Sequence, residues 1–158
     1  MMDEKTTFLR HTLASLAYRA GKPLRHAPPE FATFRADPTS RTPVQIVAHM
    51  GDLFDWALTI ANGQEAWHSS QPLAWDREVA RFFHALEAFD ARLASEAPVE
   101  APFERLIQGP IADALTHVGQ LAMLRRMSGA AVHGENYFVA EIVVGRVGLD
   151  QAAPVKEF

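Results

Sequence analysis

The run TPVQIVAHMGDLFDWALTIANG, residues 42–63, decides how this chain folds. It begins with a threonine suited to cap a helix and a proline suited to the first helical position, and Gln45 follows the cap Thr42 by three residues. Apolar residues then recur every three or four positions as far as Asn62, and Gly63 is suited to end a helix. The run therefore predicts a long amphipathic helix.

Three other segments carry the same period, and loops rich in proline, glycine and serine separate them. They extend from about Asp3 to Ala20, from Trp75 to Ser95, and from Gly109-Pro110 to Ser128. A fifth segment, Asn136 to Val147, could form a short helix or a strand, and we favour the helix because asparagine is a suitable N-cap. The prediction is a single all-α domain over residues 1–158, a four-helix bundle with a short C-terminal fifth helix.

The composition of the 158-residue chain narrows the classes of function. Hydrophobic residues make up 48% of the chain, enough for a packed core, while the absence of cysteine excludes disulfides, a thiolate nucleophile and cysteine-ligated metal sites. A formal net charge of −4 argues against binding to nucleic acid, which normally needs a basic surface. No apolar run approaches the ~18 residues of a membrane span, and the start lacks the apolar core of a signal peptide, so we expect a soluble, cytoplasmic protein.

His49 falls within the apolar stripe of the 42–63 helix. Ile46 precedes it by three residues, and Leu53, Trp56 and Ile60 follow it at four, seven and eleven, so that all five share one face. The pattern predicts that the imidazole points inward. Two interpretations stay open: a core histidine whose nitrogens bond neighbouring groups, and a metal ligand.

Asp113 and His117 lie four residues apart on the last predicted helix, on the face that also carries Gln120, Leu121 and Leu124. Their Cβ atoms are expected about 6 Å apart, so both side chains can reach one ion. A carboxylate on an apolar face is costly to bury without a cation. The alternatives are an ordinary Asp–His ion pair and a carboxylate near the positive end of the helix dipole.

Together the three residues predict one metal site, if the N-termini of their two helices lie at the same end of the bundle. Two imidazoles and one carboxylate, from His49, His117 and Asp113, suit zinc, nickel or iron(II), and three protein ligands leave coordination positions open. Open positions are typical of catalytic rather than structural sites. Gln120 and Asp52 are candidates to orient the imidazoles, since they follow His117 and His49 by three residues.

Other ionisable residues are interpreted as background. His68 is expected in a loop, and Arg125 and Arg126 are expected to be solvated or ion-paired near the end of the last helix, where the dipole favours cations. His133 follows that helix and could approach the mouth of the site. None of these residues is predicted as a ligand, and no catalytic acid or base is assigned.

Two of these motifs resemble the DinB/YfiT-like superfamily. The first is Thr42-Pro-Val-Gln-Ile-Val-Ala-His49-Met-Gly-Asp-Leu, and the second is Asp113-Ala-Leu-Thr-His117-Val-Gly-Gln120-Leu. The stretch Asn136-Tyr137-Phe138 is also similar to the segment after the last helix there, and the resemblance covers about residues 5–148, with its specific part confined to the two histidine motifs. Members of that superfamily are four-helix bundles, often homodimers, in which one histidine of the second helix and a histidine pair of the last helix bind a divalent metal.

The resemblance implies this ligand set with one departure. His49 matches the histidine of the second helix and His117 the histidine before the Gly-Gln pair, whereas Asp113 stands where the family commonly has histidine. A carboxylate keeps a ligand at that spacing and shifts the preference toward harder ions. The resemblance is to a superfamily whose characterised members include thiol-dependent enzymes, such as mycothiol-dependent maleylpyruvate isomerase and bacillithiol transferases. The role implied for the metal in these enzymes is to activate a thiol.

These expectations give a leading hypothesis and an alternative. The leading hypothesis is a metal-dependent enzyme, a hydrolase or thiol transferase, in which the ion activates a bound water or a low-molecular-weight thiol toward a small-molecule substrate. The resemblance also implies a homodimer. The alternative is a non-catalytic bundle that binds a small apolar ligand or forms a dimeric scaffold, which the aromatic third helix and the long proline-rich loop would serve.

Overall fold

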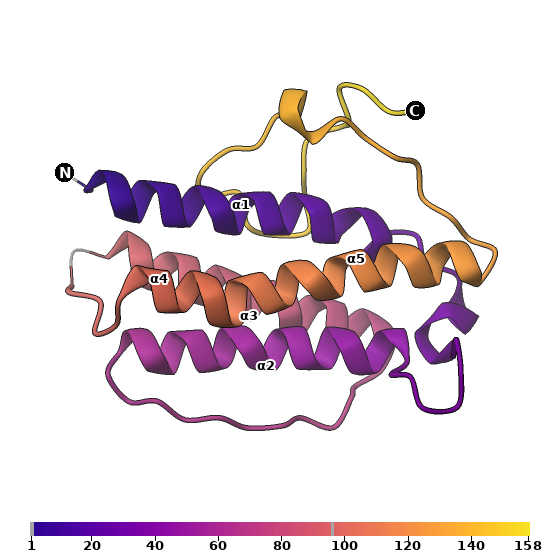
Figure 1. Cartoon of the computed structure of the whole chain (residues 1–158), viewed down its shortest axis with the longest axis horizontal. Helices are drawn as coiled ribbons and strands as arrows, with labels where there is room; N and C mark the ends of the chain where they lie inside the picture. Colours follow the sequence, from indigo (N-terminus) through magenta and orange to yellow (C-terminus); the bar gives the residue numbers. More distant parts are fainter. Residues whose placement is uncertain (1, 96) are drawn as a thin grey trace.

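Four long helices form the protein in a computed structural model that describes residues 2–95 and 97–158 (Figure 1). They are α1 (Glu4–Leu24), α2 (Pro43–Ala61), α3 (Trp75–Ala94) and α5 (Ala112–Met127). α5 continues directly from the short helix α4 (Phe103–Leu106) through the π-helical turn η2 (Ile107–Ile111), and the 3-10 turns η1 (Pro29–Thr33) and η3 (Tyr137–Val139) lie in the connections. The predicted all-helical architecture is confirmed. None of these helices is long and apolar enough to cross a membrane.

The four long helices form a ring in which α1 and α2 each pack against α3 and α5. α1 and α5 run in the same direction, because Leu9 and Ile107 border one pocket and Arg125 donates to the carbonyl of Pro23. α2 and α5 run in opposite directions, because Ile46 near the start of α2 lies beside Leu124 near the end of α5 (Figure 1). The assumption that α2 and α5 begin at the same end of the bundle is therefore wrong.

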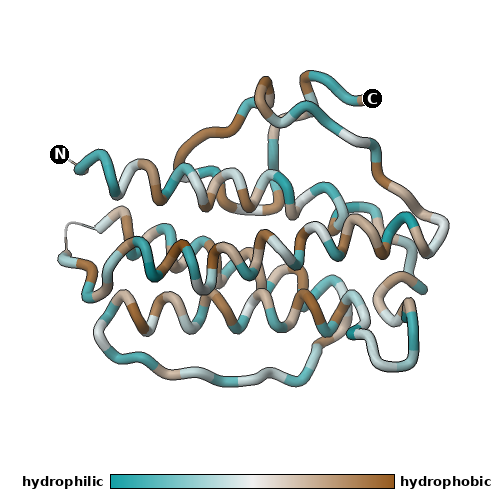
Figure 2. Tube along the Cα trace, in the orientation of Figure 1, coloured by the Kyte–Doolittle hydropathy of each residue, from teal (hydrophilic) through white to brown (hydrophobic). Residues whose placement is uncertain are grey.

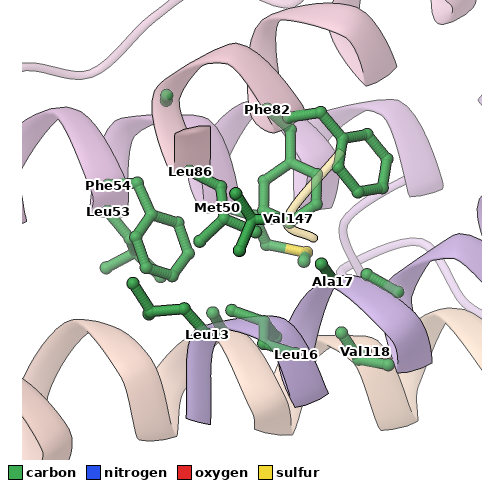
Figure 3. Packing of buried hydrophobic residues seen from close by; sticks show 14 of the residues in the cluster. Leu13, Leu16, Ala17, Met50, Leu53, Phe54, Phe82, Leu86, Val118 and Val147 are labelled. Atoms are coloured by element: carbon green, nitrogen blue, oxygen red, sulfur yellow. The ribbon is translucent and has the colours of Figure 1, made fainter. Parts of the chain in front are cut away.

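Apolar side chains from all four long helices meet in one core (Figure 3). Polar and apolar residues are interleaved along each of these helices (Figure 2). Full burial of one large apolar side chain contributes about 1.5–3 kcal/mol, so the core dominates the stability of the bundle. The helical period of α3 places one apolar stripe in this core, and all its members are buried: Val79, Phe82, Leu86, Phe89 and Leu93.

The predicted capping box at the start of α2 is present. The backbone N–H of Thr42 donates to Oε1 of Gln45 at 2.9 Å, and the backbone N–H of Gln45 donates to Oγ1 of Thr42 at 3.4 Å. The two bonds satisfy donors that the first helical turn leaves without partners. They fix where α2 begins, and so they set the height of His49 in the bundle.

A 13-residue connection, residues 62–74, runs back along the outside of α2 before α3 begins (Figure 1). Hydrogen bonds hold it there: Nε1 of Trp56 donates to Glu65 at 3.2 Å, and the backbone N–H of Ser70 donates to Oδ2 of Asp52 at 2.8 Å. Because the connection returns to the starting end of α2, α2 and α3 run in the same direction. The connection also brings loop residues beside the middle of α2.

The prediction of a fifth helix over Asn136–Val147 is wrong, because only the single turn Tyr137–Val139 is helical. Asn136 does cap that turn, since its side-chain oxygen accepts from the backbone N–H of Phe138 at 3.1 Å, but the turn ends at Val139. Exposed and half-buried residues alternate over residues 141–146, as in an extended chain, and the segment is anchored in the core by Val147. Gly145, with φ +88°, interrupts any helical path.

Candidate metal centre

The three predicted ligands come together between α2 and α5. Nε2 of His49 lies 3.1 Å from Oδ2 of Asp113, and Nε2 of His117 lies 3.4 Å from Oδ1 of the same carboxylate. The two imidazole rings are nearly perpendicular, with an interplanar angle of 85° and centroids 5.0 Å apart. One ligand atom from each residue lies within 4.8 Å of the other two, a spacing at which a single ion could contact all three.

The residues converge although their helices are antiparallel. His49 lies in the second turn of α2, while Asp113 and His117 lie in the middle of the continuous helical stretch 103–127. Helical backbone begins at Phe103, the first residue of α4, rather than at the predicted Gly109, and it continues through η2 into α5. Asp113 is therefore preceded by more than two turns of helical backbone, and the proposed placement at a helix N-terminus does not explain its carboxylate.

The π-helical turn Ile107–Ile111 directly precedes Asp113. Pro110 lies inside it, and proline in a regular helix loses a hydrogen bond and clashes with the preceding turn. The π turn accommodates this proline by inserting one residue, which rotates all later side chains by about 100° around the axis. The face that α5 presents to α2, and with it the direction of the Asp113 side chain, follows from that insertion.

Gln120 orients His117, as predicted. Nδ1 of His117 lies 2.7 Å from Oε1 of Gln120, an oxygen that accepts from an Nδ1–H. In a neutral ring with this tautomer, Nε2 carries a lone pair that faces Oδ1 of Asp113 at 3.4 Å. A proton or a metal cation at this point makes the contact favourable, and this donor set of two imidazoles and one carboxylate suits a divalent ion.

The cluster lies at the edge of the core rather than at its centre. The exposed fraction of the side chain is 11% for His117, 20% for His49 and 45% for Asp113. The centre of the buried face of α2 belongs instead to fully buried residues such as Met50 and Phe54. The expectation that His49 points inward is thus met only in part, and the position at the edge leaves the cluster open to solvent.

An aromatic side chain from the 62–74 connection also borders the cluster, which the sequence did not indicate. The indole of Trp67 packs edge-on to the imidazole of His49, with ring centroids 5.8 Å apart, and to Trp56, with centroids 5.7 Å apart. The connection has no apolar period from which this contact could be inferred. It therefore supplies a wall of the site that only the folded chain reveals.

A second group of metal-competent side chains lies one turn further along α2. Nε2 of His68 lies 3.1 Å from Asp52 and 3.3 Å from Asp55. Arg81 of α3 reaches the same carboxylates at 3.1 and 3.3 Å, and its Nε–H donates to Glu78 at 2.6 Å. Burial raises the pKa of Asp55, although Arg81 and His68 oppose that rise. Within this group a guanidinium already provides the neutralising charge.

Two expectations about individual residues, Asp52 and Arg125, need correction, while His133 lies apart from the cluster, as its interpretation as a background residue predicts. Asp52 does not orient His49, because its carboxylate accepts from the backbone and hydroxyl of Ser70 at 2.8 and 2.7 Å. Arg125 is buried rather than solvated, and it donates to backbone carbonyls near the end of α1; burial lowers its pKa. His133 borders the groove between α1 and α5, and it is not among the residues of the cluster.

Comparison with known proteins gives no relative from which a function could be transferred. No family model, no curated protein and no solved structure matches the chain.

Proposed function

We propose that this protein is a DinB-like metal-dependent enzyme, a hydrolase or thiol transferase, that holds one zinc, nickel or iron(II) ion on His49, Asp113 and His117. One observation carries the proposal: the carboxylate of Asp113 lies between two imidazole nitrogens, and in the described part of the chain no lysine or arginine is paired with it. A divalent ion would supply the missing positive charge and use all three groups at once.

The open edge of the cluster favours a catalytic ion over a structural one. When bound, the ion supplies a Lewis acid that lowers the pKa of a coordinated water or thiol. Gln120 holds His117 in the tautomer that a ligand needs, and Trp67 packs against the His49 ring. Because the chain contains no cysteine, a thiol would have to come from a low-molecular-weight cosubstrate.

The test is metal content and metal titration. Protein purified without a metal-affinity tag is expected to contain close to one transition-metal ion per chain by elemental analysis, or to take one up after treatment with a chelator. The matched variant His49→Ala should lose that ion while the bundle stays folded by circular dichroism. A wild-type protein that neither contains nor takes up stoichiometric metal would contradict the proposal.

The second candidate function is a non-catalytic scaffold, alone or as a homodimer. A groove of about 880 Å³ lies between α1, α5 and the C-terminal segment, and the exposed apolar side chains Phe8, Met123 and Phe158 border it. Such a groove could bind a small apolar ligand or a second copy of the chain. On this hypothesis His49→Ala would cost only ordinary packing stability, and sedimentation velocity at micromolar concentration would report the dimer.

A further inference from the structure

A pocket of about 460 Å³ opens directly beside His117. Ile46 of α2 and Leu124 of α5, both buried, form apolar walls, and the exposed Met123 also borders the pocket. Its volume falls within the range of small-molecule sites. A ligand seated in this pocket would contact the side chain that holds the ion in the proposed centre.

Arg41 is the cationic residue on the wall of this pocket. It directly precedes the capping box at Thr42, so its backbone position is fixed by the start of α2. The guanidinium of Arg41 forms no hydrogen bond or ion pair with any residue in the described ranges, whereas that of Arg35 donates to the carbonyl of Ser40 at 2.6 Å. The nearby carboxylate of Asp37 accepts bonds within its own turn. Arg41 is thus available to a ligand.

The charges around the pocket favour an anionic ligand. Two neutral imidazoles and one carboxylate would leave a divalent ion with a net charge of about +1, and Arg41 adds a second positive charge beside apolar walls. A guanidinium binds a carboxylate through two parallel hydrogen bonds. We infer that the substrate is a small molecule with an apolar body and a carboxylate, and that Arg41 binds this carboxylate; the inference rests on the proposed function.

The test compares 4-phenylbutyrate with its uncharged primary amide by isothermal titration calorimetry. The carboxylate is expected to bind wild-type protein at least tenfold more tightly than the amide. Arg41→Gln should remove that preference, and Arg41→Lys should retain part of it. The control Arg105→Gln changes an exposed arginine on α4 that does not border the pocket, and it should leave both affinities unchanged.

Titrations of the chelator-treated and the zinc-loaded protein separate this inference from the proposed function. Failure to take up zinc would contradict the proposed function, while Arg41-dependent binding to the metal-free protein would still be measurable. Equal affinities for carboxylate and amide, no binding of either, or carboxylate binding that Arg41→Gln leaves unchanged would overturn the inference. The last result would mean that the carboxylate contacts the ion directly.

Discussion

Two clusters of histidine and aspartate lie against α2, one turn apart, and they differ in the charge that neutralises their carboxylates. His49 and Asp113 meet His117 at an edge of the bundle, and within residues 2–95 and 97–158 no arginine or lysine pairs with Asp113. Asp52 and Asp55 meet His68, and Arg81 lies among them. Spacing alone makes both clusters suited to a metal ion.

Ligand spacing is therefore a weaker criterion for a metal site than charge balance. A carboxylate removed from water needs a compensating cation. Arg81 supplies it in the second cluster through three ion pairs, one of them with the buried Glu78, so an ion there would have to compete with the guanidinium. In the first cluster Asp113 is 45% exposed, and no side-chain cation of the described residues is paired with it, so an ion would meet no competing guanidinium there. The first cluster is therefore the better candidate.

The largest effect is expected from removing one ligand of the first cluster. His117→Ala should weaken binding of zinc by at least ~100-fold, or about 2.7 kcal/mol, because only two ligands remain. His68→Ala, the matched change in the second cluster, should leave both affinity and stoichiometry unchanged. Competition titration with a chromophoric chelator measures both variants. A loss of zinc in His68→Ala alone would reverse the assignment of the two clusters.

The second prediction concerns Arg81 itself. Arg81→Met would leave Asp52 and Glu78 buried without their cation, and we expect a loss of about 2 kcal/mol in the free energy of unfolding, below the value for a fully buried pair because Arg81 is partly exposed. Arg77→Met, an exposed position on the same helix, is the control. Added calcium or zinc should restore part of the stability, since the second cluster would then lack its internal cation. Urea unfolding with and without metal reads out both effects.

The sequence predicts the first cluster because its signals are local. The capping box at Thr42 sets the start of α2, and the four-residue spacing of Asp113 and His117 puts both on one face of a helix. Nothing local reveals that α2 and α5 are antiparallel, since this depends on the course of residues 62–74. The bonds of Arg125 to Pro23 likewise join positions about one hundred residues apart, so the burial of that arginine could not be read from its neighbours.

The second cluster and the C-terminal segment also depend on contacts between residues far apart in the sequence, which local patterns do not reveal. Asp52 and Asp55 share a face of α2, but their partner His68 lies in a connection with no period, where no pattern predicts position. The segment after Asn136 offers a good N-cap and apolar residues four apart at Val139, Val143 and Val147, yet only one turn is helical. Gly145, with φ +88°, breaks the helical path, and contacts of Val147 with the bundle hold the segment in place. Local helix signals do not produce a helix where tertiary packing favours another path.

The smallest expected effect is a pH dependence of the free energy of unfolding that arises from Asp55, at the edge of the second cluster. Burial raises the pKa of Asp55 above its ordinary 3.8, so the folded protein holds that proton more tightly than the unfolded chain. The contribution of Asp55 to stability is therefore present at low pH and is lost as pH rises through the folded pKa. Asp55→Asn should change stability by less than about 0.5 kcal/mol at pH 7, because the side chain is 38% exposed. As pH falls toward 4, the wild type should gain stability relative to this variant.

Asp37 provides the control of opposite sign for that measurement. Hydrogen bonds from Thr39 lower the pKa of its carboxyl, so its contribution is present above the ordinary pKa and is lost as pH falls. The wild type should thus lose stability relative to Asp37→Asn on acidification, while it gains relative to Asp55→Asn. Thermal unfolding of the three proteins between about pH 2.5 and pH 7 measures both trends, because the folded pKa of Asp37 lies below 3.8. Parallel pH profiles for the two variants would show that the burial of Asp55 beside Arg81 does not disfavour its charged form.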